Sequence, residues 1–378
     1  MNCGTPLRIL HLTHTSSMGG GEYHLVQHAR GLKERGHEVC VACSAGNMRL
    51  REALVAAGVS VVLIPAGSSW MLAGALTHIL RRQCRSWKPD LICANTLTTA
   101  AIAAFMKRAT HGKLVYAVMV IRHDRRLTPL LRFIYRRLDG VMYNSRFTQG
   151  SYRAMLSYEM PEFINFSTVE DPRTKLGDTA ARSELRKVLL ASGEKLVGFV
   201  GRIHPEKGVM DFLQMAETLR RVDSGIRFVL IGAKEGKFQR YADEAEVFAR
   251  ERLGGAATFL GHVDNPAPHI AVMDCLVNPT YGEGFGRVAL EAAYLGTPIV
   301  ATEPGGMTEI LAGYRKARLV PWRRPDLLAD AVGELMATYP YSQARDADSS
   351  VAAKFDHATL IDNELAFFRR VLLDDGSS

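Results

Sequence analysis

Two glutamates flank a run of glycines in the part of this sequence that is richest in candidate chemistry. Glu283 and Glu291 belong to the segment Tyr281-Gly282-Glu283-Gly284-Phe285-Gly286-Arg287-Val288-Ala289-Leu290-Glu291-Ala292. On one uninterrupted helix, residues eight apart point about 80° away from each other, so the two carboxylates would not align. Glycines interrupt a helix, which predicts that Glu283 lies on a loop and Glu291 in the early turns of the helix that follows. Both carboxylates can then border one pocket.

The neighbours of Glu291 in the sequence are apolar, namely Val288, Ala289, Leu290, Ala292 and Ala293. Burying a carboxylate without a hydrogen-bond partner is costly. The sequence therefore favours a hydroxyl-rich ligand as the partner of Glu291. The alternative is a carboxylate that caps a neighbouring helix.

Two cations lie close together at a predicted strand-to-helix turn. Gly201 and Arg202 end the strand, and Lys207 precedes the next helix. Free amides at the start of a helix favour anions, and a planar guanidinium together with a mobile ammonium suits phosphate oxygens. Arg202 and Lys207 thus predict a diphosphate clamp, and a solvated loop with surface charges is the alternative.

A third candidate loop carries three glycines, Gly19, Gly20 and Gly21, between the first predicted strand and a helix. Glycine lets the backbone approach a ligand closely, and the helix start again favours an anion. The pattern is not Gly-x-Gly-x-x-Gly, and no acidic residue ends the second strand, which argues against a nicotinamide dinucleotide. A plain turn is the alternative here.

Short β-rich runs alternate with amphipathic segments of helical length, which is typical of βα units around parallel sheets. The predicted strands are 8–12, 38–43, 59–64, 90–94, 114–118, 140–143, 196–200, 227–231, 257–260, 275–278, 298–301 and 317–320. The polar stretch 168–179 loses this periodicity and is predicted to be a linker. We therefore expect an α/β protein with two doubly wound parallel sheets, in domains 1–168 and 169–356. A terminal helix in 357–378 is expected to pack back toward the first domain.

The composition agrees with a globular protein of two domains. The chain has 378 residues, 47% of them hydrophobic and 23% charged, which exceeds one ordinary core and excludes disordered and fibrous classes. Its six cysteines show no paired spacing except Cys40 and Cys43, which a strand would place on opposite faces. No apolar run approaches a membrane span and no signal-peptide pattern opens the chain, so we expect a cytoplasmic protein with reduced thiols.

The positive charge is concentrated in the first half of the chain. Residues 1–168 hold 21 Lys and Arg against 9 Asp and Glu, a balance of +12, whereas the remainder holds 26 against 30, a balance of −4. This asymmetry predicts an anionic partner for the first half, either nucleic acid, anionic lipid or an acidic substrate.

One segment of that half is especially basic, because residues 122–137 contain six arginines and one aspartate. On a single helix Arg125, Arg132 and Arg136 would fall within about 40° of one another. The opposite side of that helix would carry Leu127, Leu131, Ile134 and Leu138. Such a helix is typical of proteins that bind an anionic membrane surface or an acidic acceptor. The alternative is a helix that packs on the core and exposes a stripe of solvated arginines.

Taken together, the motifs resemble those of a known enzyme family. Glu283 with Glu291, Arg202 with Lys207, the early glycines and the segment Pro304-Gly305-Gly306-Met307-Thr308-Glu309 are similar to those of retaining, nucleotide-sugar-dependent glycosyltransferases of family 4. The resemblance runs from about Arg8 to the terminal helix and is closest to enzymes of bacterial polysaccharide or lipopolysaccharide synthesis. It implies a GT-B fold, in which two Rossmann-like domains face a cleft. The N-terminal domain would then bind the acceptor and the C-terminal domain the donor.

The resemblance also implies roles for single residues in donor binding. Glu291 would bind the ribose hydroxyls and Glu283 the donor sugar. Arg202 and Lys207 would hold the diphosphate and stabilise the departing nucleotide. His123 matches a cleft histidine of the family near the donor sugar, with a solvated loop histidine as the alternative.

Backbone groups complete the donor site that the resemblance implies. Amides near Gly284, Phe285 and Gly286 would reach the sugar, and Gly20 with Gly21 would approach the donor from the opposite domain.

The resemblance further implies chemistry without a metal or other cofactor. Family members retain the anomeric configuration, with attack of the acceptor hydroxyl from the leaving-group side and a phosphate oxygen that helps to take its proton. The cations at positions 202 and 207 would neutralise the leaving group. Asp346 and Asp348 form the one Asp-x-Asp motif, in a Ser-rich polar stretch that we interpret as solvated surface.

We therefore expect a hexosyltransferase that uses a UDP-sugar, with a GDP-sugar as second choice, and a glycan or glycolipid acceptor in cell-surface polysaccharide or lipopolysaccharide synthesis. A peripheral position on the inner face of the cytoplasmic membrane would suit a glycolipid acceptor. The first alternative is a nucleotide-sugar 2-epimerase on the same fold. A nucleic-acid-binding protein ranks last, because aromatic residues do not interleave with the basic ones as stacking platforms would.

Overall fold

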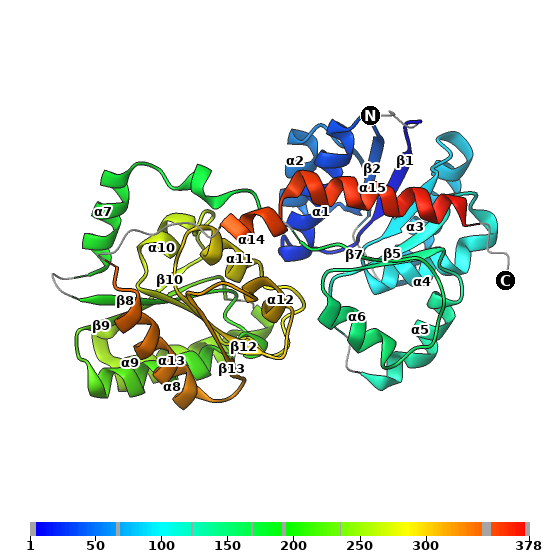
Figure 1. The fold of residues 1–378 in the computed structure, drawn as a ribbon. Coiled ribbons are helices and arrows are strands. Elements are labelled where there is room, and N and C mark those ends of the chain that lie inside the picture. The colour runs from blue at the N-terminus through cyan, green and yellow to red at the C-terminus, as the bar shows by residue number, and fades with distance from the viewer. Residues whose placement is uncertain are drawn as a thin grey trace. The chain divides into compact units, whose positions relative to one another are not determined.

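The computed structural model describes residues 5–65, 69–121, 124–167, 169–190, 194–234, 236–341 and 349–374. The chain divides into two compact units, one formed by Met1–Thr168 with Phe355–Ser378 and the other by Val169–Lys354. Each unit contains one parallel sheet with helices packed on it, as Figure 1 shows. The predicted α/β class, with two Rossmann-like sheets in tandem, is confirmed.

The sheet of the first unit has seven strands in the order β3-β2-β1-β4-β5-β6-β7, and all pairings are parallel. The strands are β1 (Arg8–Leu12), β2 (Glu38–Ser44), β3 (Ser60–Ile64), β4 (Leu91–Ala94), β5 (Lys113–Val118), β6 (Gly140–Tyr143) and β7 (Glu162–Ile164). Parallel strands covered on both faces are apolar throughout, which is why the central strands could be recognised in the sequence. The short strand β7 was missed.

Helices cover both faces of this first sheet. One layer consists of α1 (Gly20–Glu34), α2 (Met48–Ala56) and α15 (His357–Leu373). The other layer consists of α3 (Ser69–Ser86), α4 (Leu97–Met106), the short 3-10 helix η1 (Lys107–Ala109), η2 (Arg125–Leu127), α5 (Thr128–Tyr135) and α6 (Arg146–Arg153). Cys40 packs in the core under α3 to α6 and Cys43 in the core under α1, α2 and α15, on opposite faces as predicted.

Helix α15 is fixed to the first unit by a buried polar group as well as by apolar packing. Glu364 is 1% exposed, and its Oε2 lies 2.6 Å from His28 Nδ1 on α1. Asn165, which follows β7, donates from Nδ2 to the other carboxylate oxygen at 3.1 Å. The same helix buries Leu365, Phe368 and Val371.

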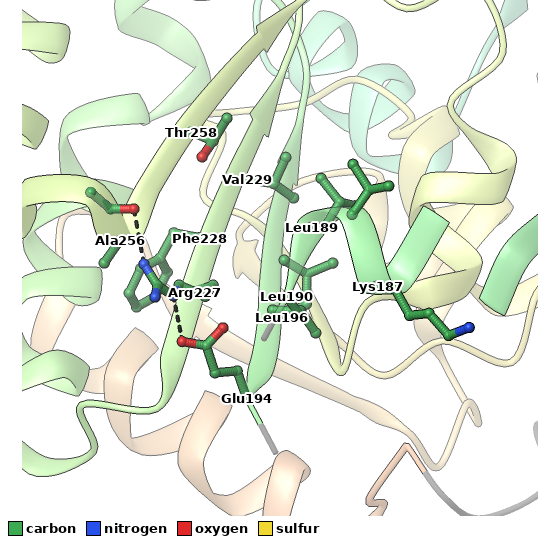
Figure 2. Close-up of a pocket in the computed structure, with 12 residues that line it drawn as sticks. Lys187, Leu189, Leu190, Glu194, Leu196, Arg227, Phe228, Val229, Ala256 and Thr258 are labelled. Atoms are coloured by element: carbon green, nitrogen blue, oxygen red, sulfur yellow. Dashed lines mark hydrogen bonds and ion pairs between the residues drawn. The ribbon is translucent and has the colours of Figure 1, made fainter. Parts of the chain in front are cut away.

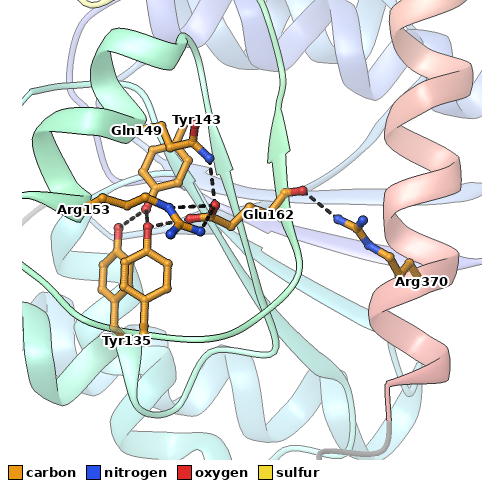
Figure 3. A network of polar contacts seen from close by, with 7 residues as sticks. Tyr135, Tyr143, Gln149, Arg153, Glu162 and Arg370 are labelled. Carbon is orange, nitrogen blue, oxygen red and sulfur yellow. Dashed lines mark hydrogen bonds and ion pairs between the residues drawn. The ribbon is translucent and has the colours of Figure 1, made fainter.

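A second polar network holds α6 and β7 together at one end of the same sheet (Figure 3). The hydroxyls of Tyr143 and Tyr158 lie 2.5 Å apart, and Tyr158 donates to Glu162 Oε1 at 2.5 Å. Arg153 on α6 donates to Glu162 Oε2, while Arg370 on α15 donates to the Glu162 carbonyl at 2.6 Å. Burial raises the pKa of both tyrosines, so they remain protonated donors. The network thus connects α6, β7 and α15 within the first unit.

The sheet of the second unit has six parallel strands in the order β10-β9-β8-β11-β12-β13. The strands are β8 (Lys195–Val200), β9 (Ile226–Ile231), β10 (Ala257–Gly261), β11 (Cys275–Asn278), β12 (Ile299–Glu303) and β13 (Ala317–Pro321). The described helices are α7 (Thr179–Leu189), η4 (Pro205–Lys207), α8 (Val209–Val222), η5 (Gly236–Phe238), α9 (Gln239–Leu253), η6 (Gly254–Ala256), α10 (Ala267–Val272), α11 (Arg287–Tyr294), α12 (Met307–Leu311), α13 (Pro325–Thr338) and α14 (Ser349–Lys354). All six strands predicted for this half are present.

The segment expected to be a linker is structured in part. Residues Pro172–Lys175 form the 3-10 helix η3, which packs against α10 and α11. The guanidinium of Arg173 lies 5.9 Å from the centre of the Tyr294 ring on α11. Tertiary contacts of this kind leave no periodic signal in the sequence, so this helical turn within the predicted linker could not be recognised there.

Within the described ranges, none of the helices combines the length and the apolar character that crossing a bilayer requires.

Candidate active site

Three loops of the second unit lie at the carboxyl edge of its sheet, after the neighbouring strands β8, β11 and β12. Ligands of doubly wound proteins bind at this edge. The loop after β8 carries Arg202 and Lys207, the loop after β11 carries Glu283, and the loop after β12 carries Gly305 and Gly306. Three candidate residues and the motif after β12 therefore meet at one edge because of the strand order.

Lys207 and Glu283 are in direct contact. The Lys207 ammonium, at the end of η4, forms an ion pair with Glu283 Oε2. Each side chain is 23% exposed, so the pair is accessible to a ligand yet partly shielded from water. The Tyr281 amide also donates to the Glu206 carbonyl at 2.8 Å, which ties the two loops together next to the pair. The side chain of Arg202 is exposed at the same edge, directly after β8.

Glycines allow these loops to pack without space between them. A Cβ at Gly306 would overlap the Gly284 carbonyl, and the Gly306 amide donates to the Glu283 carbonyl at 2.8 Å. Gly286 caps α11 with a φ of 96°, in the left-handed region that favours glycine. The glycines around Glu283 are thus required by the protein itself, in addition to any role toward a ligand.

Glu291 lies in the second turn of α11, as predicted, with 17% of its side chain exposed. Its Oε2 atom is inaccessible and has no hydrogen-bond donor among the described residues. The nearest cation is Arg287, whose Nη2 lies 3.9 Å from Glu291 Oε1. Burial raises the pKa of Glu291, and the charges of Arg287 and Lys175 oppose this effect only in part. A partner that donates hydrogen bonds to Oε2 would relieve the cost of this burial.

The sequence analysis missed both cations near Glu291. Arg287 precedes Glu291 by four residues, so helical spacing alone could have identified it. Lys175 comes from η3, whose packing on α11 brings it close, and no local pattern indicated this.

The loop that connects β11 to α11 is also fixed from the opposite side. Asp211 on α8 accepts a hydrogen bond from the Tyr281 hydroxyl, and burial raises the pKa of both groups. Phe285, three residues before Val288, is 3% exposed and belongs to the packed interior of the loop. Gly284 and Gly286 are buried on either side of it.

The remaining predicted donor residues belong to the first unit. Gly20 and Gly21 begin α1, and a Cβ at Gly21 would meet no atom within 4 Å, so the unit itself does not require glycine there. Glu22 Oε2 accepts from the Gly19 amide at 3.0 Å, so one amide of this helix start already has an anionic partner. His123 lies outside the described residues, as do Asp346 and Asp348.

The arginine-rich segment is not one helix, and this prediction was wrong. Arg125 lies in the 3-10 helix η2, and α5 begins only at Thr128 because Pro129 favours the first turn of a new helix. The predicted polarity holds for α5 and the residues directly after it. Arg132 and Arg136 are exposed, and the apolar side chains opposite them are buried, namely Leu131, Ile134 and Leu138.

A hollow of about 340 Å³ lies elsewhere on the second unit, beside the amino ends of β8, β9 and β10 (Figure 2). Leu189 and Leu190 at the end of α7 line it together with Phe228. An ion pair of 2.7 Å between Arg227 and Glu194 borders it. It contains no predicted site residue and lies at the opposite edge of the sheet from Glu283.

Two family models match the chain, one in each unit. The model described as Glycosyltransferase Family 4 matches residues 18–159, and the model described as Glycosyl transferases group 1 matches residues 194–338. The second range contains Arg202, Lys207, Glu283 and Glu291.

Curated relatives are similar over parts of the chain. A D-inositol 3-phosphate glycosyltransferase of Mycobacteroides abscessus is 32% identical over 198 residues, which are 52% of this chain and 43% of the relative. A glycogen synthase of Mycobacterium tuberculosis is 28% identical over 287 residues, 73% of this chain and 67% of that enzyme. The chain thus spans less than half the length of the inositol-phosphate relative.

Solved structures match both units together. HepE of Anabaena in complex with UDP and glucose has a TM-score of 0.84 at 20% identity, covering 96% of this chain and 100% of that one. Sucrose-phosphate synthase of Thermosynechococcus elongatus has a TM-score of 0.81 at 17% identity, covering 96% and 98%. At these identities the likeness concerns the fold. The two family models, one matched by each unit, show a glycosyltransferase of the family 4 type, and the solved structures show its GT-B fold.

Proposed function

We propose that this protein transfers a hexose from a nucleoside diphosphate sugar to a hydroxyl group of a glycan or glycolipid, with retention of the anomeric configuration. The observation that carries the proposal is the group of residues that follow β11 and β8 in the second sheet. It combines the ion pair of Lys207 and Glu283 with the buried Oε2 of Glu291, which no described residue supplies with a hydrogen bond. The pair offers a cation to phosphate and a carboxylate to sugar hydroxyls. The buried oxygen needs donors, which ribose hydroxyls supply.

The ion pair suggests how donor binding is coupled to sugar recognition. A diphosphate carries more negative charge than a carboxylate and would draw the Lys207 ammonium away from Glu283. Glu283 would then be free to accept hydrogen bonds from the hydroxyls of the sugar. Without donor, the same pairing satisfies both charges, so that the empty site does not leave two uncompensated ions.

The proposed transfer requires stabilisation of the leaving group. As the bond between the anomeric carbon and the phosphate oxygen breaks, negative charge grows on the diphosphate, and Arg202 with Lys207 would neutralise it. The acceptor hydroxyl attacks from the side of the leaving group, and a phosphate oxygen takes its proton. We propose that these two cations suffice without a metal ion, so transfer should persist in excess chelator. Activity that disappears with chelator and returns with manganese would contradict this.

The similar structures support our choice of donor. HepE is described in complex with UDP, with UDP and glucose, and with UDP-glucose. We therefore propose a UDP-hexose first and a GDP-hexose second. The names of the relatives, an inositol-phosphate glycosyltransferase and a glycogen synthase, favour a polyhydroxylated acceptor, and we propose a glycan or glycolipid of cell-surface polysaccharide or lipopolysaccharide synthesis. We also propose a cytoplasmic location, where the buried thiols of Cys40, Cys43, Cys84 and Cys93 would stay reduced.

Thermal unfolding with a panel of nucleotides tests the donor site. A nucleotide at roughly a hundredfold its Kd adds about 2.7 kcal/mol to the unfolding free energy, which raises the Tm by several degrees. We expect UDP to give the largest shift and Glu291→Ala to abolish it. Equal shifts with UDP, GDP and inorganic diphosphate in wild type and variant would reject the site. An epimerised nucleotide sugar without any transfer product would reject transferase activity in favour of an epimerase.

A further inference from the structure

The helix layer of the first unit that contains α3, α4 and α5 has long stretches without any acidic residue. The elements α3, α4, η1 and α5 carry no aspartate or glutamate over their whole lengths. Helix α4 packs between α3 and α5, so the three helices form one continuous layer. This layer therefore presents cations to solvent without acidic side chains of its own.

Exposed arginines gather toward one end of this layer. Each helix leads from the carboxyl ends of the strands back to their amino ends, so the C-terminal ends of α3, α4 and α5 lie at the same edge of the sheet. The exposed arginines near these ends are Arg81, Arg82, Arg85, Arg108, Arg132 and Arg136. We refer to these six residues as the arginine surface. Within the described ranges, none of the six forms an ion pair with a carboxylate.

The acidic residues at this edge are already engaged in other contacts. Asp139 pairs with Lys107 and lies 3.9 Å from Lys113. Asp90 accepts from the Arg8 amide at 2.7 Å. Asp139 therefore balances other cations and Asp90 is held by a backbone amide, so neither is paired with the arginine surface.

An aromatic side chain stands out of the same surface. Phe105 on α4 is 78% exposed, although its helix neighbours Ala104 and Met106 are buried. It precedes Arg108 by three residues, so the ring and this cation share one side of the layer. An exposed ring among cations suits the interface of a bilayer, where the ring enters the boundary of the acyl chains and the arginines contact the headgroups.

The opposite helix layer of the same unit has a different charge pattern. Glu34 pairs with Arg30 on α1, and Asp362 on α15 pairs with Arg35. Carboxylates of this layer thus pair with cations of the same layer. The excess positive charge of the first half is therefore directed to the face that carries Phe105.

We propose that the arginine surface and Phe105 dock the protein on an anionic phospholipid bilayer. The surface belongs to the first unit and contains none of the residues proposed to bind the donor, so membrane docking and sugar transfer are separate properties. A membrane is favoured over nucleic acid because the arginines spread over three adjacent helices with a single exposed ring, whereas a single-stranded nucleic acid requires several stacking platforms in a groove. Binding to nucleic acid is an outcome of the test below.

Flotation of the full chain with vesicles tests this surface. We compare phosphatidylcholine vesicles with vesicles that contain phosphatidylglycerol, using wild type, the variant Arg108→Gln/Arg132→Gln/Arg136→Gln and a control that removes three exposed arginines elsewhere in the same unit, Arg49→Gln/Arg51→Gln/Arg369→Gln. From the usual contribution of an arginine near an anionic surface, the first variant should bind about a hundredfold more weakly and the control within a few fold of wild type. Both variants should keep the wild-type Tm, since all six side chains are exposed.

Changes of salt concentration and of Phe105 distinguish the electrostatic contribution of the arginines from the apolar contribution of the ring. Binding of wild type should fall steeply as salt rises above 0.15 M, where exposed charges are screened beyond about 8 Å. Phe105→Ser should weaken binding at every salt concentration and leave the salt dependence unchanged. Equal flotation with both kinds of vesicle, an equal loss in the control variant, or tighter binding to a 20-mer DNA than to anionic vesicles would each overturn the proposal. Nucleotide-induced Tm shifts, measured on the same variants, should match those of wild type whichever result is obtained.

Discussion

Glu291 is a side chain whose surroundings in the free protein are incomplete. Its Oε2 is buried without a donor from the part of the chain that the structure describes, and burial raises the pKa of its carboxyl group. A buried carboxylate without donors lowers the stability of the folded protein, and a ligand that supplies donors restores it. This single residue therefore links the stability of the second unit to occupancy of the proposed donor site.

Replacement of Glu291 by glutamine tests that link. Glutamine keeps the shape but removes the charge, and a hydrogen bond to a charged group is worth about 1.5 to 3 kcal/mol. We expect Glu291→Gln to bind UDP ten- to a hundredfold more weakly in titration calorimetry, and to unfold at the same or a higher temperature without ligand. Glu251→Gln, which changes an exposed glutamate, serves as the control. Wild-type affinity in Glu291→Gln would remove this residue from the site.

The two cations should affect turnover more than ground-state binding. Loss of one preorganised charge that faces a developing anion costs about 3 kcal/mol, or roughly a hundredfold in kcat. We expect this loss for Arg202→Ala and again for Lys207→Ala, measured as release of UDP from UDP-glucose. In Lys207→Ala the Glu283 carboxylate also loses its partner, so a second change, Glu283→Gln, should restore part of the stability but none of the rate. Unchanged kcat in both single variants would exclude a role for the clamp.

His11 gives the first unit a defined response to acid. It lies on β1 at 2% exposure, and burial lowers its pKa to about 4 despite the opposing charge of Glu364. The folded protein keeps this ring neutral, whereas the unfolded chain takes up a proton below about pH 6.5. The unfolded state thus binds more protons between these values, so stability falls as the pH decreases from 6.5 to about 4, by on the order of 3 kcal/mol.

Denaturant unfolding at pH 7.5 and pH 4.5 measures this contribution. His11→Gln should lose less stability between the two pH values than wild type, because glutamine takes up no proton. His111→Gln, at an exposed histidine, should follow the wild-type profile. Parallel profiles for wild type and His11→Gln would mean that other groups cause the acid response.

At the scale of elements, most strands could be read from the sequence because buried parallel strands leave continuous apolar runs. The predicted strand 196–200 corresponds to β8 (Lys195–Val200), and 275–278 corresponds to β11 (Cys275–Asn278). Strand β7 was missed because it has only three residues at the edge of its sheet. Its length and partial burial give no run to recognise.

The residues of the candidate site likewise include some that could be grouped from the sequence and some that could not. Lys207 and Glu283 could be grouped from sequence because they follow strands of one parallel sheet, whose carboxyl ends share an edge. Lys175 could not be grouped with them, since η3 reaches α11 through packing that no local pattern encodes. The prediction of one arginine-rich helix was wrong because Pro129 starts a new helix, so Arg125 does not belong to the predicted stripe.

Helix α15 depends on the buried contact between Glu364 and His28. Removing one partner of a buried, hydrogen-bonded pair costs about 3 to 5 kcal/mol, because the other partners remain buried without it. We therefore expect Glu364→Ala to lower the Tm of the first unit strongly, as followed by differential scanning calorimetry. Asn363→Ala, one position away and exposed, should change the unfolding free energy by less than about 0.5 kcal/mol. A similar small change in both variants would show that apolar packing alone holds this helix.

At the scale of the whole molecule, the two units differ in whether they are continuous in sequence. The second unit is continuous in sequence, from Val169 to Lys354, whereas the first is built from both sides of it. All four charged residues of the proposed donor site belong to the continuous unit. The arginine surface belongs to the discontinuous one.

Truncation after Lys354 should therefore damage one unit and spare the other. Without α15, the face that packs Ile361, Leu365, Phe368 and Val371 loses its cover. We expect hydrogen exchange to show lost protection in α1 and β1 of the first unit, with protection in α8 and β8 retained. Equal protection in both units of the truncated chain would contradict this division.

The return of α15 to the first unit also sets an order of events during synthesis. Residues 1–168 leave the ribosome first, yet their core includes side chains as late as Val371. The first unit must wait, with an apolar sheet face uncovered, until the whole second unit has been made. The continuous unit can complete its own core in the meantime. Chaperone dependence in the cell should consequently concentrate on the N-terminal half, and moving α15 by circular permutation to a position before β1 would let the first unit close as soon as it is translated.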